Sequence, residues 1–256
     1  MAEVETTRDG AVLTIALNRP DTLNALDGAV FAALNAAIKQ ARAADVRAVV
    51  VTGTGRGFCV GQDVTAFRDD AEGLRDRLDS WYHPAMEGLR ALEKPVIAAV
   101  NGACAGAGLS LACAADVRIA SDRAVFVPAF INLGLVPDAG ASWFLPRLIG
   151  PGRTFHWLAT SRKLGAEEAL AWGLVEEVVP ADELPARAAE LAARYAAMPT
   201  KAVAALRRLV DHAIDATFTE QLELEAQIQG GMIRTADFRE GVTAFFEKRP
   251  PSFTGA

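Results

Sequence analysis

The stretches Gly55-Arg-Gly-Phe-Cys-Val-Gly-Gln-Asp63 and Asn101-Gly-Ala-Cys-Ala-Gly-Ala-Gly108 decide the fold that we expect for this chain. Each follows an apolar run of strand character, residues 48–52 before the first and residues 96–100 before the second. We therefore expect both turns to direct backbone N–H groups into one pocket. Two such donors on one oxygen form an oxyanion hole, in which one donor contributes roughly 2.7–4 kcal/mol to stabilising an enolate or tetrahedral oxyanion. A single glycine-rich turn, taken alone, would more often be an ordinary turn that ends a strand.

Strand and helix patterns alternate along the first two-thirds of the chain, which is typical of an α/β fold. The charged stretch from Val64 to Ser80 has no strong pattern, and we expect a mobile loop there. The expected strands are residues 11–17, 47–52, 96–100, 117–120 and 175–179, and the expected helices are residues 27–44, 74–92, 141–149, 151–159 and 166–172, with a further helix starting near residue 106.

The last third of the chain reads as helical from Asp182 onward. Thr200 follows a proline and is a plausible N-cap for a helix over 201–214. Two more helices, over 218–229 and 235–247, have faces too apolar to stand alone in water. We expect these helices to pack on the core or on another subunit.

Composition limits the classes of protein that fit. With 256 residues, 51% of them hydrophobic, the chain suits one large domain, with or without a helical extension. No apolar stretch approaches about 20 residues without a charge, and the acidic start is unlike a signal peptide, so we expect a cytoplasmic protein with no membrane partner. The net charge of -6 argues against nucleic acid as a partner. Cys59, Cys104 and Cys113 lack metal-ligand spacing and are expected to be buried free thiols, with no metal and no disulfide.

Several motifs in a fixed order carry a resemblance to a known family. They are Leu17-Asn-Arg-Pro20, Asn24-Ala-Leu26, the two glycine-rich turns, Phe126-Val-Pro-Ala-Phe-Ile-Asn-Leu-Gly-Leu-Val-Pro-Asp-Ala-Gly140 and Gly241-Val-Thr-Ala-Phe-Phe-Glu-Lys-Arg-Pro250. In this order they resemble the crotonases, the enoyl-CoA hydratase/isomerase family. The resemblance implies an α/β spiral of ββα units over residues 1–200 and a C-terminal helical oligomerisation region over 201–256, assembled as a homotrimer or hexamer.

The same resemblance implies where an acyl-CoA thioester binds, with coenzyme A as part of the substrate and no separate cofactor. The oxyanion donors would be the backbone N–H groups of Gln62 and Ala107. Coenzyme A would contact the backbone from Gln62 to Val64, including Asp63, and its nucleotide and pantetheine would lie near Arg19 and Ala25. Lys248 would approach its phosphates from the C-terminal region.

Two acids of the hydratase pattern are absent from the sequence. The family places one glutamate three residues after the second oxyanion donor and another four residues before the glycine that here is Gly134; this chain has Ser110 and Phe130 there. Adding water across a conjugated C=C requires a group that activates the water and an acid that protonates the α-carbon. A neutral hydroxyl and a phenyl ring cannot replace two carboxyls, so hydratase activity should be weak or absent.

Asp138 is the carboxylate that the motif does supply. Taken without the resemblance it would more often be a helix N-cap, whereas the resemblance implies a catalyst. Burial beside Phe130, Leu135 and Trp143 would raise its pKa and a helix N-terminus would lower it, and the sequence does not decide between them. His83 is a conceivable helper, although a surface or packing role suits its context better.

One carboxylate beside an oxyanion hole can remove a proton from one carbon and return it to another. We therefore expect an acyl-CoA isomerase acting on a ring-1,2-epoxyphenylacetyl-CoA or an enoyl-CoA, because the run Gly134-Leu-Val-Pro-Asp-Ala-Gly-Ala-Ser-Trp-Phe-Leu-Pro-Arg-Leu-Ile-Gly150 most resembles the epoxide isomerases of phenylacetate breakdown. The aspartate could instead act as a nucleophile, as in aroyl-CoA dehalogenases. The alternatives are an enoyl-CoA hydratase and a catalytically quiet acyl-CoA-binding protein.

Overall fold

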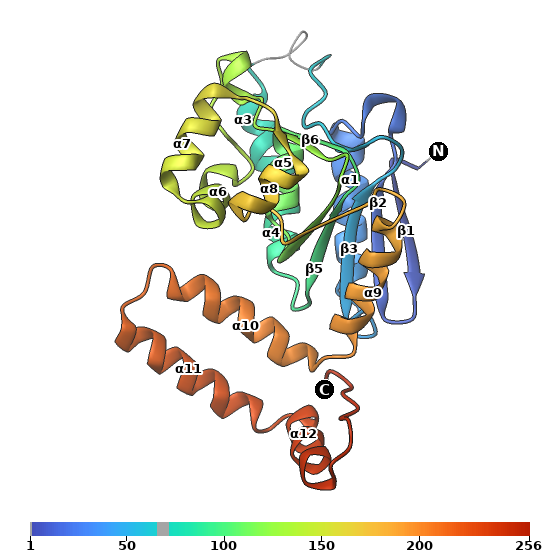
Figure 1. Ribbon diagram of the computed structural model, residues 1–256, viewed down its shortest axis with the longest axis vertical. Helices are drawn as coiled ribbons and strands as arrows, with labels where there is room; N and C mark the ends of the chain where they lie inside the picture. The colour runs from blue at the N-terminus through green and yellow to red at the C-terminus, as the bar shows by residue number, and fades with distance from the viewer. Residues whose placement is uncertain (1, 66–71) are drawn as a thin grey trace.

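Two β-sheets with helices around them form the body of the molecule (Figure 1). The computed structural model describes residues 2–65 and 72–256. In spatial order, the larger sheet consists of β1 (Val4–Asp9), β2 (Val12–Leu17), β3 (Ala48–Gly53), β5 (Val96–Val100), β7 (Val117–Ser121) and β10 (Glu177–Val179). The smaller sheet consists of β4 (Gly57–Cys59), β6 (Ala103–Ala105), β8 (Val125–Val127) and β9 (Leu164–Gly165). From β2 to β10 and from β4 to β8 neighbouring strands are parallel, whereas β1 and β9 are antiparallel edge strands.

The chain repeats one supersecondary unit three times. In each unit, one strand joins the larger sheet, the next joins the smaller sheet, and a helical segment follows. β3 and β4 precede α3 (Leu74–Arg77) and α4 (His83–Arg90), which are joined by the π-helical turn Leu78–Tyr82. β5 and β6 precede α5 (Ala107–Cys113), and β7 and β8 precede α6 (Ala141–Ile149). The structure is therefore built from ββα units.

Alternating side chains of the central strands serve two separate cores. In β3, Val49 and Val51 belong to the main core, which includes Phe31 of α1 (Gly28–Ala41). Ala48 and Val50 point to the opposite face, which α9 (Leu184–Ala196) covers. This period-2 arrangement requires apolar residues on both faces of the strand, which explains its continuous apolar sequence.

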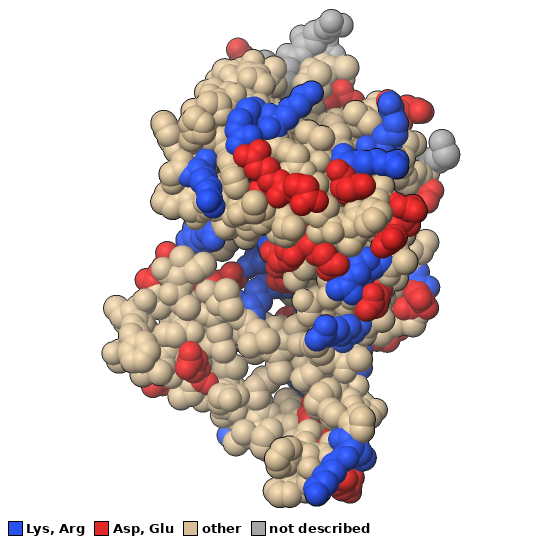
Figure 2. Space-filling view, viewed as in Figure 1, with Lys and Arg blue, Asp and Glu red and all other residues tan. Residues whose placement is uncertain are grey.

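The C-terminal helices extend away from the two sheets (Figure 1). The remaining helices of the described chain are α7 (Pro151–Thr160), α8 (Ala166–Trp172), α10 (Thr200–Ala213), α11 (Phe218–Met232) and α12 (Ala236–Glu247). On the face shown in Figure 2, uncharged atoms cover most of the surface of α10 and α11, whereas acidic and basic side chains are interspersed over the sheets. Apolar side chains on α10 to α12 remain largely exposed, including Val210, Phe218, Phe245 and Phe246.

The sequence located the long elements well, and three local expectations need comment. Thr200 is not an N-cap: Pro199 precedes the helix, and the Thr200 hydroxyl accepts a hydrogen bond from Arg47 at 3.0 Å. The mobile loop expected over 64–80 is wrong for 74–80, which is helical, and its residues 66–71 lie outside the described residues. The three cysteines are buried free thiols, as expected. In the described ranges, every helix is too short or too polar to cross a membrane.

Candidate active site

The two glycine-rich turns meet at one edge of the smaller sheet. β4 and β6 are parallel neighbours, with Cys59 paired to Cys104, so their carboxyl ends lie side by side. Gly61 follows β4 with φ +87°, and a Cβ added to it would lie 3.0 Å from the Ala105 carbonyl oxygen and 3.1 Å from the Ala107 nitrogen. Glycine therefore fits this position both for its backbone conformation and for the close approach of the second turn.

The first turn is fixed by backbone hydrogen bonds on either side of Gln62. The Leu26 N–H donates to the Gly61 carbonyl at 2.8 Å, and the Asp63 N–H donates to the Leu26 carbonyl at 2.9 Å. Among the backbone hydrogen bonds of the described turns and caps, neither the Gln62 N–H nor the Ala107 N–H is a donor. The arrangement is suited to binding one oxyanion between these two groups, which stay the predicted oxyanion hole.

Asp138 lies before α6 without capping it. Gly140 is the N-cap of α6, and no side chain caps this helix, so the interpretation of Asp138 as a helix cap is wrong. The buried Ser110 hydroxyl donates to the Asp138 backbone carbonyl at 3.0 Å and holds this residue against α5. The Oδ1 atom of Asp138 is buried and has no hydrogen-bond partner among the described residues. The structure thus presents a carboxylate that is fixed through its backbone and unpaired at its side chain.

The environment of Asp138 favours a base that works near neutral pH. Burial raises the pKa of Asp138 to about 6, and the charge of a protonated His83 opposes this rise. The pKa of Asp138 is thus shifted upward, a direction that the sequence left open, and burial is the main cause. The half-exposed His83 has its Nδ1 atom 3.3 Å from the Asp79 carboxylate. His83 is therefore next to the carboxylate of Asp79. The burial and raised pKa of Asp138 are properties that suit a group that transfers protons.

The other pocket candidates occupy different places. Phe130 is buried at the start of a 3-10 helix (Phe130–Leu133), and its carbonyl accepts a hydrogen bond from the Leu135 N–H at 3.1 Å. Leu135 is partly buried against the same core. Trp143 faces outward: the residue is 39% exposed, and the Arg147 guanidinium lies 4.0 Å from the centroid of its ring. Trp143 therefore lines an outer groove next to the loop of Asp138.

Arg19 is surrounded by carboxylates in this structure. Its guanidinium lies 2.9 Å from Asp27, 3.3 Å from Glu3 and 3.5 Å from Asp63, and it donates to the Ala25 carbonyl at 2.9 Å. The pKa of Asp63 is lowered, chiefly by its hydrogen bonds with Thr65. Arg19 thus ties Ala25 to the first turn, and an incoming phosphate would compete with three acids for it.

Lys248 and Val64 are exposed, in two different parts of the molecule. Val64 follows the first turn and is 59% exposed. Lys248 is the left-handed C-cap of α12, which lies at the opposite end of the view from α5 (Figure 1). A single chain therefore does not bring Lys248 to the two turns. Among the described residues, no group of three His, Cys, Asp or Glu side chains is arranged to hold a metal ion.

Tyr82 is a residue that sequence reasoning missed. It ends the π-helical turn, is 1% exposed, and has its ring centroid 4.3 Å from that of Phe31. Its hydroxyl is buried with no hydrogen-bond partner among the described residues. Its spacing of three and four residues from the buried Ala85 and Met86 is the signal that could have placed it on the inner face of the helix.

Comparison with known proteins agrees with this architecture. The profile of the enoyl-CoA hydratase/isomerase family matches residues 7–256. A protein of Rhodobacter capsulatus named probable enoyl-CoA hydratase is 44% identical over 241 residues, which cover 94% of this chain and 93% of that protein. The 1,2-epoxyphenylacetyl-CoA isomerase of Escherichia coli K12 is 41% identical over 249 residues, which cover 95% of each chain.

A solved structure extends the match to the fold. The crystal structure of an enoyl-CoA hydratase from Bacillus anthracis superposes with a TM-score of 0.94 at 35% identity, covering 99% of this chain and 100% of that one. This protein belongs to the enoyl-CoA hydratase/isomerase family, and its crotonase-type α/β fold is confirmed. It is therefore an enzyme of a family that acts on CoA thioesters.

Proposed function

We propose that the protein is an acyl-CoA isomerase in which Asp138 moves one proton between two carbons. The thioester oxygen is held by the N–H groups of Gln62 and Ala107, which stabilise the enolate that forms when the proton leaves. The observation that carries this proposal is the buried, unpaired Asp138 carboxylate with its pKa raised to about 6. Such a group is deprotonated at neutral pH and is basic enough to accept a proton from an activated carbon.

Hydration is the competing reaction, because the relative from Rhodobacter capsulatus carries a hydratase name. The chemistry of the site disfavours it. Hydration requires one carboxyl that activates water and another that protonates carbon. The positions at which the family's hydratases carry these two glutamates hold Ser110 and Phe130 in this chain. Ser110 is also occupied in binding the Asp138 carbonyl. The substrates that suit this site are an epoxyphenylacetyl-CoA, as named for the Escherichia coli relative, and an enoyl-CoA.

A panel of thioesters tests the reaction class. Purified protein is incubated with 3-enoyl-CoA, crotonyl-CoA and ring-1,2-epoxyphenylacetyl-CoA, and products are followed by absorbance and mass. We expect isomers of unchanged mass from the first or third substrate and little gain of 18 mass units from crotonyl-CoA. Rapid hydration of crotonyl-CoA would identify a hydratase. Absence of turnover with all three, together with tight binding, would identify a quiet binding protein.

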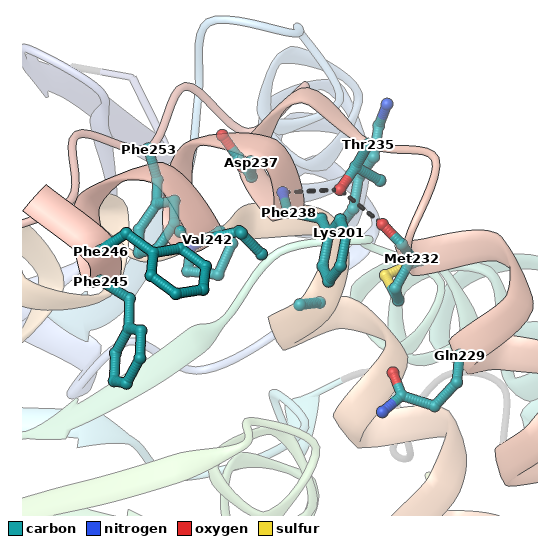
Figure 3. Close-up of a pocket in the computed structure, with 13 residues that line it drawn as sticks. Lys201, Gln229, Met232, Thr235, Asp237, Phe238, Val242, Phe245, Phe246 and Phe253 are labelled. Atoms are coloured by element: carbon teal, nitrogen blue, oxygen red, sulfur yellow. Dashed lines mark hydrogen bonds between the residues drawn. The ribbon is translucent and has the colours of Figure 1, made fainter.

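We also propose that residues 201–256 form an oligomerisation region that builds a homotrimer or a hexamer. A hollow of about 480 Å³ lies among the C-terminal helices and is lined by Phe238, Val242, Phe245, Phe246 and Phe253 (Figure 3). Phe245 and Phe246 are 78% and 79% exposed as residues, and exposure of apolar groups to water is costly. A second subunit would cover these rings and could bring its Lys248 to an acyl-CoA site. A well-folded monomer in light scattering at micromolar concentration would contradict this assembly.

A further inference from the structure

Three buried polar atoms near the two turns have no hydrogen-bond partner among the described residues. They are the Asp138 Oδ1, the Tyr82 hydroxyl and the Gln62 Nε2. A buried polar group left unpaired is costly, and each such group in a folded protein requires an explanation. Asp138 is explained by proton transfer. The Tyr82 hydroxyl is not used by that mechanism.

The position of Tyr82 is rigid. Its ring packs at 51° to the Phe31 ring, with centroids 4.3 Å apart, and both residues belong to the main core. The π-helical turn that carries it departs from the regular helix on either side, and such turns frequently occur at functional sites. The hydroxyl is therefore held in place by packing and not by a hydrogen bond.

The Tyr82 hydroxyl lies within electrostatic range of Asp138. Burial raises the pKa of Tyr82, and the negative charge of Asp138 raises it further, so the phenol stays protonated. Asp138 and Tyr82 are close enough to interact electrostatically, yet no hydrogen bond joins them. A protonated phenol in this position can donate to an acceptor that enters with the substrate.

We propose that Tyr82 donates a hydrogen bond to an oxygen carried by the acyl group of the substrate, so that the site selects oxygen-bearing acyl chains over hydrocarbon ones. The inference rests on the proposed function, because it places the acyl group between Asp138 and Tyr82. A hydrocarbon chain leaves the hydroxyl buried and unpaired, whereas an epoxide or cyclic ether oxygen satisfies it. Sites built to hydrogen-bond a substrate oxygen reject the analogue that lacks it.

An isosteric pair of unreactive ligands tests this selection. Tetrahydropyran-2-ylacetyl-CoA and cyclohexylacetyl-CoA differ by one ring oxygen in place of a CH₂ group. We expect calorimetry to show that the wild type binds the ether on the order of tenfold more tightly than the hydrocarbon, and that Tyr82→Phe abolishes this preference. Tyr195→Phe is the matched control, because Tyr195 is the second of the two tyrosines and lies in α9; it should retain the preference.

A stability measurement separates a binding role from a structural one. Because no described residue pairs with the hydroxyl, Tyr82→Phe should unfold at the same or a higher urea concentration than the wild type. Equal affinity of the wild type for the two ligands, or a preference that survives in Tyr82→Phe, would overturn the inference while leaving isomerase activity intact. Failure of the proposed function gives a different result, since the wild type would then either hydrate crotonyl-CoA or turn over no thioester of the panel.

Discussion

The candidate active site and the C-terminal helices both carry groups that one chain leaves unsatisfied, but the groups are of opposite kinds. At the site, polar atoms of Asp138 and Tyr82 are buried and have no hydrogen-bond partner within the described part of the chain. On α12, the rings of Phe245 and Phe246 are exposed to solvent. A buried polar atom is satisfied by a small ligand that enters a cavity, whereas an exposed apolar face is satisfied by a protein surface. This difference supports the proposals of catalysis in the first region and of subunit assembly in the second.

The largest expected effect is on proton transfer at the first region. Asp138→Asn keeps the shape of the side chain but removes the base, so the rate of isomerisation should fall by roughly 10²–10⁴-fold with little change in thioester affinity. Assays that are quenched at set times and followed by product separation measure the isomerisation rate, and calorimetry measures the thioester affinity. Asp182→Asn, an exposed aspartate in the turn before α9, is the matched control. Turnover of the Asp138 variant within a few-fold of wild type would remove Asp138 from the mechanism.

The same carboxylate should make stability depend on pH. Its pKa is about 6 in the folded protein and 3.8 in an unperturbed aspartate, so the folded state binds more protons between these pH values. The free energy of unfolding contributed by this group therefore falls as pH rises from about 4 to about 6 and is constant above that range. Asp138→Asn should be more stable than wild type near pH 8, by on the order of 1–3 kcal/mol, and similar to it near pH 4.

Urea unfolding at both pH values checks this prediction. The same pKa should also appear in the pH dependence of the wild-type reaction rate. The base must be deprotonated, so kcat/KM should rise with pH and level off above about 6. A wild type and an Asp138→Asn variant of equal stability at both pH values would show that Asp138 is better solvated than the structure indicates.

A smaller effect is expected from removing an exposed ring in the second region. Phe245→Ser should weaken subunit association, because burial of one phenylalanine ring contributes about 1.5–3 kcal/mol. Light scattering over a dilution series should show the variant dissociating at higher protein concentration than the wild type. Phe155→Ser, which removes a ring of 77% exposure from α7, is the control. Equal effects of the two substitutions would show that exposure alone does not mark the interface.

The sequence predicted most of the elements that are long enough to show a period, although it missed the six-residue strand β1 (Val4–Asp9). The bounds of β5, α6 and α8 agree with the apolar patterns over 96–100, 141–149 and 166–172. The strands β4, β6 and β8 have three residues each, which is too short for an alternation to be recognised. The smaller sheet was therefore missed, although it is what brings the two glycine-rich turns together.

Sequence motifs predicted which residues belong to the candidate site, but they did not predict the environment of those residues. Glycine spacing indicated the turns, and the resemblance supplied Asp138, but its protonation depended on burial that the sequence does not give. Ser110 was interpreted as an absent acid, whereas the structure shows it binding the Asp138 carbonyl. Contacts between residues 28 positions apart, such as this one, depend on the packing of α5 against α6 and have no local signal.

The smallest expected effect concerns coenzyme A. Arg19→Ala combined with Lys248→Ala should weaken acetyl-CoA binding by only a few-fold at low salt, and the loss should shrink as salt screens the charges. Arg19 already neutralises Glu3, Asp27 and Asp63, so it has little charge left for a phosphate. Lys248 should account for most of the loss.

The single variants distinguish the two residues. Arg19→Ala leaves three carboxylates around one vacated position, so it should lower the free energy of unfolding as well as affinity. Lys248→Ala should change affinity and leave stability nearly unchanged, because Lys248 is an exposed cap. Lys39→Ala, an exposed lysine in the last turn of α1, is the control for loss of one positive charge. Unchanged calorimetric affinity in the double variant at low salt would show that neither residue belongs to the coenzyme A site. The proposed role of the C-terminal helices would then be assembly alone.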